Sequence, residues 1–107
     1  MNSTTAELAT YAIRRKNAWG SVEEVEQVAA RSKQVAEEEF PSDIRWIRSY
    51  VLAEEDGTLG SVCIYQASSP EAIRKHAQRV GMPADEIFPV GETVVIRPDP
   101  VKEPVAS

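Results

Sequence analysis

The residues best suited to chemistry in this chain are one histidine, one cysteine and several aromatic side chains around an arginine. His76 and Cys63 are each the only residue of their type in the 107-residue sequence. Imidazole and thiol groups serve as metal ligands, acid–base groups and nucleophiles. The remaining candidates lie between residues 44 and 66 and are Trp46, Arg48, Tyr50 and Tyr65. An arginine among aromatic rings suits an anionic or aromatic ligand, because the guanidinium pairs with an anion and the rings stack.

His76 and Cys63 also have plain structural explanations. His76 lies three residues after Ile73 and four before Val80, which places it on or beside the apolar stripe of a helix. It is therefore either a hydrogen-bonded core histidine, or a metal ligand or acid–base group that faces a cavity between helix and sheet. Cys63 has apolar neighbours, which favours an inert buried thiol over a nucleophile or metal ligand.

A predicted β-hairpin holds most of the candidate residues. Its two β-rich runs are joined by an Asp-Gly turn, which supplies the positive φ that hairpin turns often need. Strict alternation along the first run would place Trp46, Arg48 and Tyr50 on one face. Neither face of this run is polar, although an antiparallel sheet with one face in water normally alternates apolar and polar residues. We therefore expect helices on one face and a second copy of the chain on the other.

The other elements follow from hydrophobic spacing and capping signals. Strands are predicted at 6–14, 44–52, 59–66 and 86–97, and helices at about 21–38 and 68–80. Ser21 and Ser68 each precede a glutamate by three residues, as in a capping box. The order β, α, β, β, α, β predicts an α+β ferredoxin-like fold, a four-stranded antiparallel sheet with two helices on one face. Such sheets often pair as dimeric α/β barrels, and we expect one domain at 6–97 between a loose leader at 1–5 and a proline-rich tail at 98–107.

Charge and composition exclude several classes of partner. The net charge is −5, whereas nucleic-acid binding relies on clustered lysine and arginine. The only basic cluster, residues 14–16, is expected to be a solvated strand end. A single cysteine forms no internal disulfide, which fits a reducing compartment. No secretion signal and no apolar run long enough for a membrane span occur in the sequence, so we expect a cytoplasmic protein that binds neither nucleic acid nor membrane.

The segment from 35 to 90 resembles a family of small bacterial proteins of unknown function. The resemblance rests on RWIRSYV at 45–51, on CIYQA at 63–67, and on PEAIRKHA at 70–77 with the residues that follow as far as Ile87. The described member of the family is a nickel-binding protein with a dimeric ferredoxin-like fold. The resemblance therefore implies a homodimer, with nickel or another divalent transition metal as a possible cofactor.

One departure from the family pattern concerns the metal. The family often has histidine where Arg48 stands, and an arginine cannot lose its proton to bind a metal. A nickel site would then depend on His76, Cys63 and carboxylates, shared between two copies, because nickel favours nitrogen and sulfur donors.

The residues favour a homodimer that binds a metal or small ligand in a pocket lined by some of the candidates Trp46, Arg48, Tyr50, Cys63, Tyr65 and His76. Two alternatives are not excluded. One is a cofactor-free dimeric α/β-barrel enzyme, an oxygenase or isomerase, with His76 as acid–base group and Tyr50 or Tyr65 as hydrogen-bond donor. The other is a non-catalytic protein-interaction dimer that uses the acidic first helix. No nucleophile motif or phosphate loop occurs in the sequence, so a binding protein is favoured over an enzyme.

Overall fold

Six elements form in the order expected from the sequence. The computed structural model describes residues 7–100. Its elements are β1 (Ala9–Trp19), α1 (Val22–Glu39), β2 (Ile44–Ala53), β3 (Leu59–Ala67), α2 (Pro70–Val80) and β4 (Glu86–Pro89). No helix among the described residues is long and apolar enough to cross a membrane. The predicted leader at 1–5 and residues 101–107 of the predicted tail lie outside the described residues.

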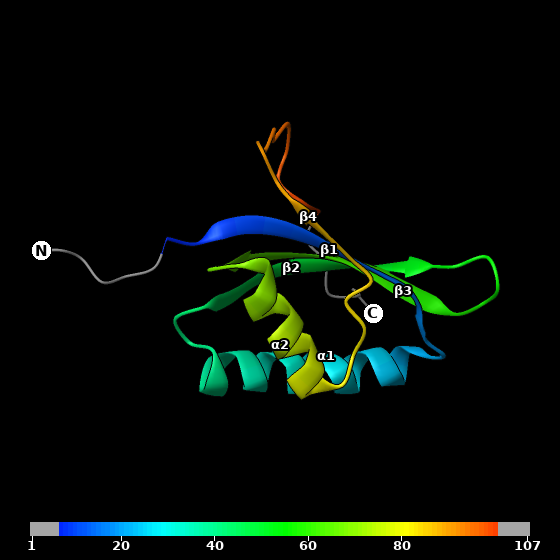
Figure 1. Cartoon of the computed structure of the whole chain (residues 1–107). Helices are drawn as coiled ribbons and strands as arrows, with labels where there is room; N and C mark the ends of the chain where they lie inside the picture. Colours follow the sequence, from blue (N-terminus) through cyan, green and yellow to red (C-terminus); the bar gives the residue numbers. More distant parts are fainter. Residues whose placement is uncertain (1–6, 101–107) are drawn as a thin grey trace, which may run out of the picture.

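The four strands form one antiparallel sheet in the order β2-β3-β1-β4. Both helices lie on the same side of this sheet, below it in Figure 1. We call the face that the helices cover the inner face, and the opposite face the outer face. This arrangement is the ferredoxin-like one, so the predicted fold class is confirmed at the level of element order, sheet topology and helix placement.

The predicted cap Ser21 is confirmed for α1, although the Glu24 side chain bonds to Gly20 instead of the Ser21 N–H, and the cap of α2 shifts by one residue. The Glu24 N–H donates to Ser21 Oγ at 3.2 Å, and the Glu24 carboxylate accepts from the backbone N–H of Gly20 at 3.1 Å. In α2 the cap is Ser69, whose hydroxyl oxygen accepts from the Ala72 N–H at 3.1 Å. Ser68, which the spacing favoured, instead donates to Asp43 at 2.8 Å and so holds the chain before α2 against the start of β2.

Two strands differ in length from the prediction. β1 continues to Trp19 instead of ending near residue 14. Its pairing with β3 is interrupted after Arg15, where Asn17 has φ 48°, and resumes at Trp19. β4 ends at Pro89, and one further backbone bond, from the Val90 N–H to the Thr10 carbonyl at 2.9 Å, follows it. Residues 91–100 form no strand, and Val94, Val95 and Ile96 are 69–84% exposed.

A β-bulge in β2 changes which side chains share a face. Trp46 pairs with Tyr65, whereas Arg48 pairs with Ile64, so Ile47 is an extra residue in β2. Trp46 packs against the core on the inner face, whereas Arg48 and Ile47 line the outer face. The expectation that Trp46, Arg48 and Tyr50 share one face is therefore wrong, because the bulge interrupts the alternation after Trp46.

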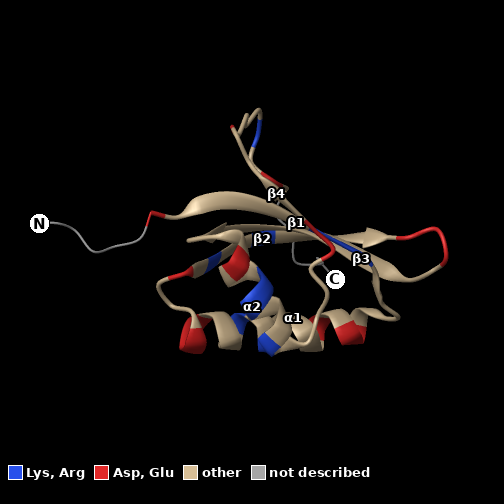
Figure 2. Cartoon of the chain, in the orientation of Figure 1, with Lys and Arg blue, Asp and Glu red and all other residues tan. Residues whose placement is uncertain are grey.

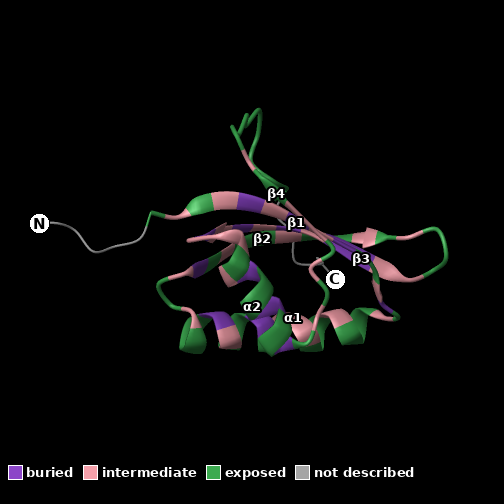
Figure 3. Cartoon of the chain, viewed as in Figure 1, coloured by how far each residue is buried: buried purple, intermediate pink, exposed green. Residues whose placement is uncertain are grey.

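The core lies between the inner face and the two helices, where Figure 3 shows the buried segments. Its fully buried members include Ile13, Tyr65 and Ile73. The outer face has no such cover. Ile47, Tyr50 and Phe88 are 44%, 42% and 50% exposed there.

Candidate functional site

His76 is buried at the centre of the layer between sheet and helices. It is 0% exposed, and its Nε2 lies 3.0 Å from the carbonyl oxygen of Ser32 in α1. Because a carbonyl only accepts, Nε2 carries the hydrogen, and Nδ1 is left as a buried lone pair with no hydrogen-bond partner. Burial lowers the pKa of His76, and the Arg15 cation lowers it further, against the opposing effects of the Ser32 carbonyl and Glu39. The imidazole is therefore neutral at neutral pH.

Arg15 is the second buried polar group of this layer. The prediction that residues 14–16 form a solvated strand end is wrong for Arg15, which is 0% exposed. Its Nε donates to the Pro83 carbonyl at 2.6 Å, and its Nη1 donates to Cys63 Sγ at 3.1 Å. Its Nη2 has no hydrogen-bond partner. The alternation of Tyr11, Ile13 and Arg15 along β1 could have indicated this position, because all three side chains point to the inner face.

Tyr65 connects the two buried groups. The Arg15 guanidinium carbon lies 5.9 Å from the centre of the Tyr65 ring, and the ring centres of Tyr65 and His76 are 5.7 Å apart. The Tyr65 hydroxyl lies 3.3 Å from the Ser32 hydroxyl, and burial raises the pKa of Tyr65. Trp46 packs beside Tyr65, with ring centres 6.2 Å apart. We call Arg15, Ser32, Cys63, Tyr65 and His76 the inner cluster.

A different polar group lies on the outer face. Arg48 Nη1 donates to Asp99 Oδ2 at 2.8 Å, and the Tyr50 hydroxyl donates to the same oxygen at 2.6 Å. The hydrogen bond with Tyr50 and the charge of Asp99 raise the pKa of Arg48. These groups line a groove of about 950 Å³ between the outer face and residues 90–99, which Ile47 and Ile64 also line. We call Arg48, Tyr50 and Asp99 the outer group.

The six residues predicted to share a pocket are therefore divided by the sheet. Trp46, Cys63, Tyr65 and His76 lie on the inner side, whereas Arg48 and Tyr50 lie on the outer face. Of the inner four, only Trp46 lines one of the three main hollows of the described residues. That hollow, of about 380 Å³, lies between α1 and β2, and a third of about 330 Å³ lies at the start of α2.

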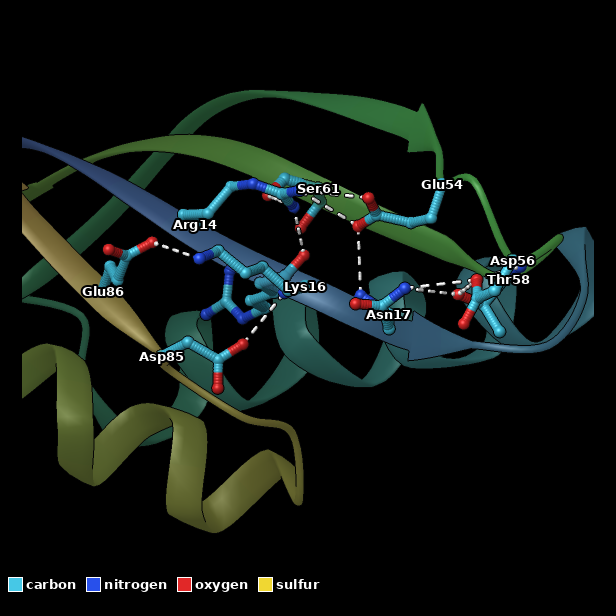
Figure 4. Close-up of polar contacts among 10 residues, drawn as sticks. Arg14, Lys16, Asn17, Glu54, Asp56, Thr58, Ser61, Asp85 and Glu86 are labelled. Atoms are coloured by element: carbon cyan, nitrogen blue, oxygen red, sulfur yellow. Dashed lines mark hydrogen bonds and ion pairs between the residues drawn. The ribbon is translucent and has the colours of Figure 1, made fainter.

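A polar network joins the β2–β3 turn to β1. Figure 4 shows Glu54 bonded to Arg14 and to the backbone of Asn17, at 3.0 Å in each case. The hydrogen bond from Asn17, with the contributions of Arg14, holds the pKa of Glu54 below its usual value. Figure 2 shows this turn as an acidic segment. Because its carboxylates are already paired or hydrogen-bonded, we assign the network to positioning β1 against the hairpin.

The donor atoms do not fit a metal site within one chain. No group of three histidine, cysteine, aspartate or glutamate side chains among residues 7–100 is arranged to hold a metal ion. The free Nδ1 of His76 and the thiol of Cys63 are the two soft donors, and Arg15 places a permanent cation against the thiol. A second cation at this position would be repelled, since Arg15 stays protonated at all ordinary pH values.

The described residues define a small ferredoxin-like α+β protein with a buried polar cluster under its sheet and an outer face that no helix covers. Residues 11–90 match the family described as "Nickel responsive protein SCO4226-like". The chain belongs to this family, which confirms the resemblance inferred from the motifs at 45–51, 63–67 and 70–77. No curated protein and no solved structure matches the chain.

Proposed function

We propose that the protein is a homodimer that binds a small carboxylate-bearing ligand on the outer face of its sheet. One observation carries this proposal. Arg48 and Tyr50 donate to a single carboxylate oxygen of Asp99, at 2.8 and 2.6 Å. Asp99 comes from the chain's own segment after β4, and its carboxylate is the kind of group that a guanidinium and a phenol hold together.

The surroundings of the outer group suit a ligand with an apolar body. The groove volume of about 950 Å³ is within the range of small-molecule sites. Ile47 and Ile64 line it beside the two donors. An aromatic or branched carboxylate would thus pair its anionic group with Arg48 and place its apolar part on the sheet.

A second copy of the chain would enclose this ligand. The outer face exposes Ile47 and Tyr50 on one edge strand and Phe88 on the other by 42–50%, and exposed apolar surface of this kind often marks an interface. Pairing the same face of two copies gives a two-fold symmetric interface, the commonest kind in soluble oligomers. The two-sided apolar character of β2 supports this assembly.

Nickel binding, which the family's description suggests, has weaker support. The unpartnered Nδ1 of His76 is one available donor. However, His76 and Cys63 lie on the inner side of the sheet, so pairing two outer faces would not bring the soft donors of two copies together. We therefore favour the carboxylate ligand over a nickel ion shared between copies.

Catalysis by His76 also has little structural support. His76 and Tyr65 are 0% and 1% exposed, and both are hydrogen-bonded or in contact with Ser32 in α1. Neither residue lines any of the three hollows described above. A substrate in the outer groove would be separated from His76 by the sheet, which favours a binding protein over an enzyme.

Calorimetric titration with benzoate tests the proposal. Benzoate should bind the Asp99→Ala variant at least tenfold more tightly than the unchanged protein, because the competing internal carboxylate is removed. Arg48→Gln, combined with Asp99→Ala, should abolish this binding. Glu39→Gln is the matched control, because it removes a carboxylate that pairs with Arg79 at 2.7 Å elsewhere on the surface. Absence of benzoate binding to Asp99→Ala at millimolar concentration would overturn the assignment.

A further inference from the structure

Arg15 is a buried cation for which the structure provides no carboxylate partner. The side chain is 0% exposed, and the four ion pairs among residues 7–100 involve Arg14, Lys16, Arg48 and Arg79. Buried charges are normally paired with an opposite charge, because an isolated ion in the interior is costly. The carbonyl of Pro83 and the ring of Tyr65 satisfy the guanidinium only in part.

The position of the sulfur atom next to Arg15 suggests where the missing charge could arise. Cys63 Sγ lies 3.1 Å from Arg15 Nη1 and 3.4 Å from the Ser61 hydroxyl. Arg15 Nη2 is a further donor without a partner. Oxygen atoms added to this sulfur would therefore meet a guanidinium and a hydroxyl that are already in place.

The packing argues against an anion that binds from solution. Arg15, Cys63 and His76 line none of the three hollows described above, so none of these hollows gives a separate ion a route to the inner cluster. Cys63 is nevertheless 6% exposed, and hydrogen peroxide is little larger than a water molecule. An anion formed on the sulfur itself does not have to enter the cluster as a separate ion, and the peroxide that forms it needs only limited access to Cys63.

We propose that Cys63 is an oxidation site, at which a peroxide converts the thiol to a sulfinate that forms an ion pair with Arg15. In the first step the sulfur takes one oxygen atom from hydrogen peroxide, which gives a sulfenic acid and water. A second peroxide supplies the second oxygen atom, which gives the sulfinate, a released proton and another water. In each step sulfur loses two electrons and the peroxide gains them. The inference is independent of the ligand on the outer face.

The pairing has a consequence that ordinary oxidative damage does not share. Oxygen atoms forced into a packed core normally destabilise it. Here the sulfinate would supply the negative charge that Arg15 lacks, so the oxidised protein should be more stable than the reduced one. A rise in unfolding temperature therefore indicates a site preorganised for the sulfinate, whereas a fall indicates oxidative damage.

The test combines intact and peptide mass spectrometry with thermal unfolding after treatment with millimolar hydrogen peroxide. The folded protein should gain two oxygen atoms on Cys63, and its unfolding temperature should rise by roughly 4–8 °C, the shift expected for one strong interaction in a domain of this size. Cys63→Ser under the same treatment is the control for oxidation of the two methionines. Arg15→Met should lose the rise in unfolding temperature.

Two results would overturn the proposal, and both come from the unsubstituted protein. The first is a Cys63 that stays unmodified in the folded chain under conditions that oxidise it in denaturant. The second is an oxidised Cys63 that lowers the unfolding temperature. Neither result depends on whether Arg15→Met folds.

Discussion

The imidazole Nε2 of His76 lies 3.0 Å from the carbonyl oxygen of Ser32, so a side chain of α2 is hydrogen-bonded to the backbone of α1. This bond requires the hydrogen on Nε2. It also explains how a polar ring is accommodated among Ile73, Phe40 and Tyr65. The ring stays neutral, since burial and Arg15 lower its pKa.

Stability should fall as the pH decreases below about 6.5. The unfolded chain binds a proton at His76 near the ordinary value of 6.5, whereas the folded protein binds it only at lower pH. Between these two pKa values the unfolded state holds more protons than the folded state. The free energy of unfolding therefore increases as the pH rises and decreases on acidification. Urea unfolding between about pH 7.5 and 5.5 measures the slope.

The matched variant for this prediction is His76→Gln. Its amide can donate to Ser32 without titrating, and His76 is the only histidine in the chain. Three carboxylates have lowered pKa values and titrate at lower pH, so they do not contribute to the slope in this range: Glu39, Glu54 and Asp56. An unchanged slope in His76→Gln would show that another group is responsible.

Gly60→Ala should destabilise the protein by about 2 kcal/mol, within the usual cost of overpacking. A Cβ at Gly60 would lie 2.5 Å from the Arg15 carbonyl oxygen, and this backbone atom is held by the pairing of β1 with β3. Gly91→Ala is the control, because a Cβ there meets nothing within 4 Å. Equal unfolding temperatures for the two variants would contradict the close approach of β1 to β3.

Ile47→Glu should convert the proposed dimer to a monomer. Ile47 is 44% exposed on the outer face, and a carboxylate there would be desolvated in a symmetric interface. Val22→Glu introduces the same charge at an exposed position of α1 and should leave the dimer intact. Light scattering coupled to size-exclusion chromatography at micromolar concentration measures the mass. A monomeric unsubstituted protein would refute the assembly.

Nickel should bind weakly to the isolated protein, with no stoichiometric binding at micromolar concentration. The reason is the donor set, in which Arg15 lies against the thiol of Cys63. Calorimetry with nickel chloride checks this, and His76→Gln should give the same trace as the unsubstituted protein. Tight stoichiometric binding that His76→Gln removes would restore the metal-site hypothesis for His76.

The parts of the fold that depend on local chemistry were predictable from the sequence. Ser21 identifies the start of α1, and Gly57, at φ +90°, marks the hairpin turn. The inner cluster was partly predictable as well, because Cys63, Tyr65 and His76 follow the alternation of a strand and the stripe of a helix. These signals act within a few residues, so a single sequence contains them.

The division of the candidate residues between two faces was not predictable in the same way. The bulge at Ile47 depends on the pairing of β2 with β3, and no residue type near it requires a bulge. Asp99 was missed because it follows Arg48 by 51 positions. Arg15 was assigned to solvent because arginine is rarely buried, although its place in the alternation pointed inward.

The extra residue in β2 also affects how related sequences should be compared. Before Ile47 the even-numbered residues of β2 face the helices, and after Ile47 the odd-numbered residues do. A relative of the same length whose strand runs through this point without the bulge would turn the counterpart of Arg48 toward its core, two residues after the counterpart of Trp46. Column-by-column alignment would then equate a surface residue with a buried one, so strand pairing, more than residue identity, should decide which relatives share the outer group.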